Sequence, residues 1–114
     1  MSNLRPRHTA SVGLAELAHL LGVDGPGTGP QVSGVTLDSR AVLPGDLYAA
    51  LPGANVHGGR FAGGAQASGA VAVLTDADGA ALAAAAGVSV PVLVVAAPRA
   101  ALGPAAALIY ANRP

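Results

Sequence analysis

The sequence has no cysteine and no lysine among its 114 residues, and only three of its residues are aromatic. Without cysteine the chain has no disulfide, thiol nucleophile or thiolate metal ligand, as is common in cytoplasmic proteins. Without lysine it offers no P-loop lysine, Schiff base or carbamylated lysine, which excludes most ATP-dependent chemistry by these residues alone. We therefore expect this segment to bind a ligand and to have no catalytic activity by itself.

Charge is scarce as well. Six arginines balance six acidic residues, so the formal net charge is zero. No basic face is available to hold a phosphate backbone, and nucleic acid is not an expected partner.

One long uncharged run, residues 79–98, has the length of a membrane span. Gly87, Ser89 and Pro91 divide this run, however, and its second half is β-branched. This pattern favours a helix followed by a buried strand over a membrane span. The N-terminal apolar run contains Glu16, which is not typical of a signal peptide. We expect a cytoplasmic protein with no membrane partner.

The spacing of apolar residues predicts one α/β domain over residues 13–114, preceded by a disordered leader over residues 1–12. The expected helices are 13–21, 60–68, 79–86 and 98–110, and the expected strands are 31–37, 47–51, 71–75 and 90–95. Strands that alternate with short helices imply βαβ crossovers and a small, mostly parallel sheet flanked by helices. Ser11 is the expected N-cap of the first helix, and Asp76 or Asp78 that of the third.

Ligands of parallel sheets usually bind beyond the C-terminal ends of the strands. Residues 36–40 follow the first strand and combine hydroxyls, a carboxylate and a guanidinium, a mixture that suits a nucleoside. The alternative is that Asp38 stabilises a turn and pairs with Arg40. Residues 52–58 follow the second strand and offer backbone N–H groups to an anion, or form an ordinary glycine-rich connection.

The remaining polar side chains give weaker signals. His8, His19 and His57 lie far apart, without carboxylates or thiols at metal-ligand spacing, so no metal site is predicted. A histidine without a visible nucleophile is more typical of a turn or surface residue than of an acid–base catalyst. Tyr48 and Phe61 are expected to be core anchors rather than base-stacking platforms.

Three blocks in this order resemble the N-terminal domain of Mur ligases, the enzymes that build the peptide of peptidoglycan precursors. They are Val-Thr-Leu-Asp-Ser-Arg at 35–40, Val-Leu-Pro-Gly-Asp-Leu-Tyr-Ala-Ala-Leu-Pro-Gly at 42–53 and Gly-Ala-Val-Ala-Val-Leu at 69–74. The resemblance covers residues 32–114 and is nearest to MurE-type ligases, which add diaminopimelate or lysine to UDP-N-acetylmuramoyl-L-alanyl-D-glutamate.

The resemblance implies a site for the UDP end of that substrate. By matching position, Leu37 and Ser39 would contact the uridine, and Ala54, Asn55 and Val56 would form the opposite wall. The supporting residues of the same motifs are Thr36, Asp38, Arg40 and His57. The family more often has aspartate at the position of the histidine, so the resemblance assigns that residue no definite role.

The resemblance also places the family's phosphate loop, its Mg²⁺ ligands, its modified lysine and its amino-acid pocket beyond Pro114. No cofactor is therefore expected in this segment, and ATP and Mg²⁺ are expected for the full-length enzyme. The expected partners are UDP-N-acetylmuramoyl-L-alanyl-D-glutamate and the central ATPase domain of the same chain. Two alternatives stay open: a MurF-type ligase, which shares the Asp-Ser-Arg and Pro-Gly-Asp blocks, and a non-catalytic α/β interaction module.

Overall fold

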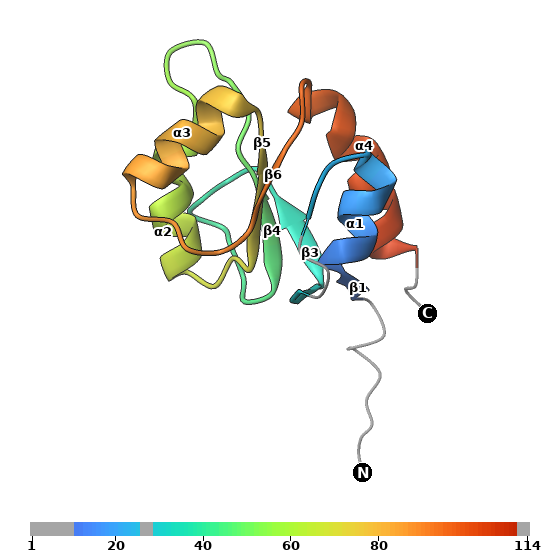
Figure 1. Ribbon diagram of the computed structural model, residues 1–114. Helices are drawn as coiled ribbons and strands as arrows, with labels where there is room; N and C mark the ends of the chain where they lie inside the picture. The colour runs from blue at the N-terminus through green and yellow to red at the C-terminus, as the bar shows by residue number, and fades with distance from the viewer. Residues whose placement is uncertain (1–10, 26–28, 112–114) are drawn as a thin grey trace.

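The computed structural model describes residues 11–25 and 29–111 (Figure 1). In chain order its elements are β1 (Val12–Gly13), α1 (Leu14–Leu21), β2 (Gln31–Val32), β3 (Gly34–Thr36), β4 (Asp46–Ala49), the 3-10 turn η3 (Gly58–Phe61), α2 (Ala62–Ala67), β5 (Ala72–Thr75), α3 (Ala77–Ala85), β6 (Val92–Val94) and α4 (Pro98–Tyr110).

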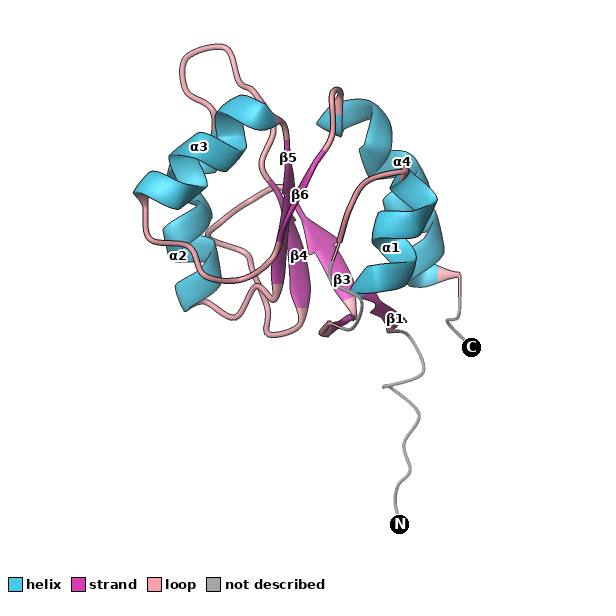
Figure 2. Cartoon of the chain, viewed as in Figure 1, coloured by secondary structure: helices cyan, strands magenta, loops and turns pink. Residues whose placement is uncertain are grey.

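The main sheet has four parallel strands in the order β3-β4-β5-β6. Figure 2 shows α2 and α3 on one side of this sheet and α1 and α4 on the other. The predicted parallel α/β architecture is confirmed. Because all four strands run the same way, the segments that follow β3 and β4 meet at one edge of the sheet.

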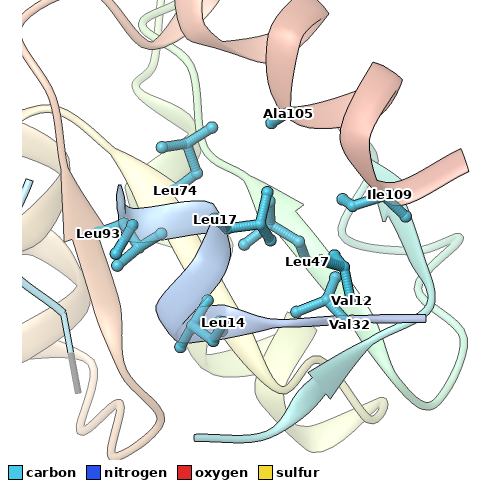
Figure 3. Close-up of a cluster of buried hydrophobic side chains, with 11 residues drawn as sticks. Val12, Leu14, Leu17, Val32, Leu47, Leu74, Leu93, Ala105 and Ile109 are labelled. Atoms are coloured by element: carbon cyan, nitrogen blue, oxygen red, sulfur yellow. The ribbon is translucent and has the colours of Figure 1, made fainter. Parts of the chain in front are cut away.

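Each face of the sheet has its own hydrophobic core, because successive side chains of a strand point to opposite faces. On one face, Leu47, Leu74 and Leu93 from three neighbouring strands pack with Leu17 of α1 and Ile109 of α4 (Figure 3). All five of these side chains are fully buried. This cluster fixes α1 and α4 against the sheet.

The core on the opposite face is made of smaller side chains. Tyr48 and Val73 pack there against small side chains of the helices, namely Ala62, Ala65 and Ala83. Small residues let α3 approach η3 so closely that a Cβ on Gly59 would lie 2.8 Å from the Cα of Gly79. The alanine-rich helices are therefore close-packed layers, which a chain with few large side chains requires.

The strand predicted over residues 31–37 is two strands. β2 pairs antiparallel with β1, which the sequence analysis missed, whereas β3 joins the main sheet. The chain changes partner at Ser33, whose N–H donates to the Gly45 carbonyl at 3.0 Å. A two-residue strand such as β1 is too short for alternation to reveal it.

The leader predicted over residues 1–12 extends too far. Val12 pairs with Val32 in the small sheet and is 3% exposed. Residues 1–10 lie outside the described part of the chain.

The predicted cap of α1 is wrong, whereas one of the two caps predicted for α3 is confirmed. Ser11 does not cap α1, because its hydroxyl donates to Gln31 Oε1 at 3.1 Å and the N-cap position is Gly13. Asp76, and not Asp78, caps α3. At the far end of the chain, the Tyr110 hydroxyl accepts the N–H of Val35 at 3.0 Å and ties α4 to β3.

Candidate functional site

A cavity of about 540 Å³ opens beyond the C-terminal ends of β3 and β4. Its volume lies within the range of roughly 300–1,000 Å³ that is usual for small-molecule sites. One wall is the turn that follows β3, and the other is formed by the loop after β4 together with η3. The lining residues are Leu37, Asp38, Ser39, Arg40, Tyr48, Leu51, Val56, Gly58 and Phe61.

The β3 wall is a turn held by its own side chains. Asp38 Oδ1 accepts the backbone N–H of Arg40 at 2.9 Å and its Nε–H at 3.3 Å. Thr36 Oγ1 accepts the N–H of Asp38 at 3.1 Å. The backbone N–H of Arg40, followed by its side chain, holds the pKa of Asp38 below its usual value. Asp38 and Arg40 thus brace the turn, as the turn interpretation predicts, and they also line the cavity.

Tyr48 lines the cavity between the two walls. Its ring belongs to the core and is 2% exposed, as expected of a core anchor. Its hydroxyl donates to the Gly58 carbonyl at 2.9 Å. Burial raises the pKa of Tyr48, the negative charge of Asp38 raises it further, and a hydrogen bond with the Ser39 side chain lowers it. The phenol therefore lines the cavity and is bonded to the loop wall through Gly58.

The loop wall is closed by backbone hydrogen bonds. The Gly53 N–H donates to the Val56 carbonyl at 3.1 Å, and the Gly58 N–H donates to the Leu51 carbonyl at 2.8 Å. A Cβ on Gly53 would lie 2.6 Å from the Val56 oxygen, so this position requires glycine. The result is a tight loop rather than an extended connection.

The structure brings together part of the expected site. Leu37 and Ser39 on one wall and Val56 on the other line the same cavity. Ala54 and Asn55 lie in the same loop but are exposed and do not line it. The gap between the two walls is open, as a ligand site requires.

Phe61 was predicted to be a core anchor, and this prediction is wrong. The ring is 47% exposed and lines the cavity together with Leu37. Leu51 and Gly58 are also lining residues that the sequence analysis did not select. The available signal was position: Phe61 ends the 3-10 turn that directly follows the glycine-rich loop.

His57 lies behind the loop wall and is bonded through both ring nitrogens. Nδ1 accepts the N–H of Gly59 at 2.9 Å, and Nε2 lies 2.8 Å from Asp76 Oδ1. The same carboxylate oxygen accepts the N–H of Gly79 at 2.9 Å. The Gly79 N–H, and after it the bond to His57, lower the pKa of Asp76. His57 caps η3, and because this 3-10 turn occupies residues 58–61, α2 begins at Ala62 instead of residue 60.

Within residues 11–25 and 29–111 no helix has the length and apolar character needed to cross a bilayer. The same ranges contain no group of three or more metal-ligating side chains.

The sequence profile of the Mur ligase family, catalytic domain, matches residues 31–110. The chain belongs to the Mur ligase family. It is 55% identical, over 95% of its length, to the UDP-N-acetylmuramoyl-L-alanyl-D-glutamate--2,6-diaminopimelate ligase of Streptomyces avermitilis. It is 54% identical, over 96% of its length, to a protein of Leifsonia xyli named UDP-N-acetylmuramyl-tripeptide synthetase. In both comparisons the match covers 21% of the relative, so the chain spans about a fifth of these proteins.

Solved structures agree on the fold. A crystal structure of MurF from Acinetobacter baumannii superposes with a TM-score of 0.65 over 86% of this chain and 21% of that one. The sequence identity is 23%, so this likeness concerns the fold alone.

Proposed function

We propose that this chain anchors the UDP end of UDP-N-acetylmuramoyl-L-alanyl-D-glutamate within a MurE-type ligase of peptidoglycan synthesis. The observation that carries the proposal is the cavity in which Leu37 and Ser39 face Val56 across the edge of the sheet. The names of the relatives that match over 95% of this chain support the choice of a MurE-type enzyme.

The lining of the cavity suits a pyrimidine nucleotide. Leu37, Val56 and Phe61 are exposed apolar side chains around one opening, and they offer surfaces for the two faces of a base. Ser39 and the backbone of the β3 turn supply polar groups for the edge of the base and the ribose. The Arg40 side chain is 90% exposed and brings a positive charge to the pyrophosphate.

The amide-forming step belongs to other parts of the ligase. The sequence contains no lysine, and the described residues contain no metal-ligating cluster, so the residues present do not fit ATP or Mg²⁺. We assign this chain to substrate affinity and orientation, and we derive no chemical step through it. The ATPase domain of the same ligase would receive the substrate in the position that this domain sets.

Titration of the ¹⁵N-labelled chain with UDP tests the proposal. We expect amide shifts at Ser39, Val56 and Phe61, with a dissociation constant on the order of 1 mM because contacts to the sugar and the peptide are missing. ADP at the same concentration is the comparison ligand, and we expect it to shift these amides less.

A matched pair of serine variants sharpens the test. Ser39→Ala removes a hydroxyl from the cavity and should weaken UDP binding roughly 2- to 10-fold, the range of one hydrogen bond. Ser89→Ala is the control. Ser89 is exposed and lies before the N-terminal end of β6, whereas the cavity lies beyond the C-terminal ends of β3 and β4. If several millimolar UDP leaves all amides unshifted, the interaction-module alternative is favoured. If both variants weaken binding equally, UDP does not occupy this cavity.

A further inference from the structure

We infer that His57 and Asp76 form a clamp that positions the loop wall of the cavity against α3, and that UDP affinity depends on this cross-link. The inference rests on the proposed function for its ligand and assigns His57 the role of a positioning residue. We also expect the clamp to order the loop when no ligand is bound.

The clamp joins two local caps into one unit. His57 Nδ1 caps the first turn of η3 by accepting the Gly59 N–H, and Asp76 Oδ1 caps α3 by accepting the Gly79 N–H. The 2.8 Å bond between His57 Nε2 and Asp76 Oδ1 links them across 19 residues of sequence. Each cap alone organises its own turn, whereas the bond between them fixes the position of one turn relative to the other.

The hydrogen-bond partners determine the tautomer of His57. Nδ1 must be unprotonated in order to accept the Gly59 N–H, so neutral His57 carries its proton on Nε2 and donates it to Asp76. Both nitrogens are therefore occupied within the protein. His57 contributes by holding the backbone in place and has no ring nitrogen free for a ligand.

The clamp sits where the cavity wall meets a rigid part of the fold. Thr75, the last residue of β5, is fully buried and its hydroxyl donates to the Ala50 carbonyl at 2.8 Å. A Cβ on Gly79 would lie 1.8 Å from Thr75 Oγ1 and 2.6 Å from His57 Cε1, so the three residues are in close contact. Asp76 is thus held in place by the neighbouring strand β5, and its bond to His57 holds the loop in place as well.

Besides the clamp, the loop wall is attached to the core through the Gly58 carbonyl, which accepts the Tyr48 hydroxyl. Val56, which lines the cavity, is the neighbour of His57, and its carbonyl is used by Gly53 within the loop. Residues 52–56 are all exposed. Without the clamp, the position of Val56 relative to the β3 wall would depend on the Tyr48–Gly58 bond and on bonds internal to the loop. A wall that samples several positions loses affinity, since ordering it on binding costs free energy.

Two variants break the cross-link and keep the caps. His57→Asn retains an acceptor at the δ position for the Gly59 N–H but is too short to reach Asp76. Asp76→Ser retains an N-cap oxygen for Gly79 but is too short to reach His57. We expect each variant to raise the dissociation constant for UDP about 3- to 10-fold and to speed amide hydrogen exchange at Gly53 and Gly58. The double variant should be no worse than either single one, because the two residues act as one unit.

Two further variants serve as controls. Asp78→Ser makes the same substitution as Asp76→Ser at an exposed residue of the first turn of α3 and should change neither UDP affinity nor loop exchange. His57→Gln places an amide N–H near the position of Nε2, and we expect it to recover part of the affinity lost in His57→Asn. Thermal unfolding of every variant separates loss of the fold from loss of loop order.

The outcomes separate the clamp from the proposed function. Wild-type UDP affinity in both His57→Asn and Asp76→Ser, with unchanged loop exchange, would overturn the clamp. Strictly additive losses in the double variant would also overturn it. If UDP fails to bind the wild-type chain, the proposed function falls, and hydrogen exchange in the same variants still tests whether the clamp orders the loop.

Discussion

Replacing Gly79 with alanine should destabilise the protein, although alanine is the better helix former. Gly79 lies in the first turn of α3, and a Cβ there would lie 1.8 Å from Thr75 Oγ1, 2.6 Å from His57 Cε1 and 2.9 Å from Thr75 Cβ. Thr75 belongs to a strand and is fully buried, so it cannot move away without disturbing β5. Helix propensity therefore predicts a more stable Gly79→Ala variant, whereas packing predicts a less stable one.

The magnitudes favour packing. Glycine to alanine in a helix gains about 1 kcal/mol from propensity. Overpacking costs about 1–3 kcal/mol, and rotation of Thr75 would leave the Ala50 carbonyl without its buried donor, at about 1–3 kcal/mol. The net loss is about 1–5 kcal/mol, which lowers the unfolding temperature of a domain of this size by at least roughly 4 °C.

Gly64→Ala is the matched control. Gly64 lies inside α2 and is exposed, and a Cβ there would meet nothing within 4 Å beyond its own stretch of helix. The propensity gain should therefore appear alone and raise the unfolding temperature. Thermal unfolding followed by circular dichroism measures both variants. An unchanged or raised unfolding temperature for Gly79→Ala would refute the packing of α3 against β5 described above.

Three further predictions concern stability. Tyr48→Phe removes the donor to the Gly58 carbonyl and should lower the free energy of unfolding, measured in urea, by about 1–2 kcal/mol, and an unchanged value would contradict the hydrogen bond assigned to this hydroxyl. Leu47→Ala, in the core beneath α1 and α4, should cost about 2–5 kcal/mol in the same assay, and a loss below 1 kcal/mol would contradict its full burial. The folded-state pKa values of Asp38 and Asp76 lie below 3.8, so these carboxylates contribute stability above pH 3.8 that is lost as the pH falls through the folded values. Urea unfolding at pH 6 and pH 3 should show a lower stability at pH 3, and equal stabilities would contradict the hydrogen bonds assigned to the two groups.

The sequence predicted the architecture well where periodicity was strong. The parallel sheet, α1 and α4 follow from apolar spacing over segments of five or more residues. The split of residues 31–37 into two strands was not predictable in this way, because it depends on β1, a two-residue partner nearly 20 residues earlier in the chain. α2 starts at Ala62 because a 3-10 turn, capped by His57, occupies the four residues before it, and periodicity does not encode that cap.

The candidate site was predictable in part for a similar reason. Leu37 and Ser39 follow a strand end directly, so topology alone places them at the edge of the sheet. Phe61 was assigned to the core because a lone aromatic residue usually packs there, but the core of this face is filled by Tyr48 and alanines. The bond between His57 and Asp76 is a long-range contact, and it required coordinates.

We expect the cavity between the β3 turn and the loop after β4 to hold the uracil ring. Intermolecular nuclear Overhauser effects between bound UDP and the chain test it most directly. We predict contacts from the uracil H5 and H6 protons to the Leu37 and Val56 methyl groups and to the Phe61 ring. Contacts to residues 76–78 and 94–96, which line a second cavity of about 390 Å³ at the ends of β5 and β6, with none to the first cavity, would contradict the account.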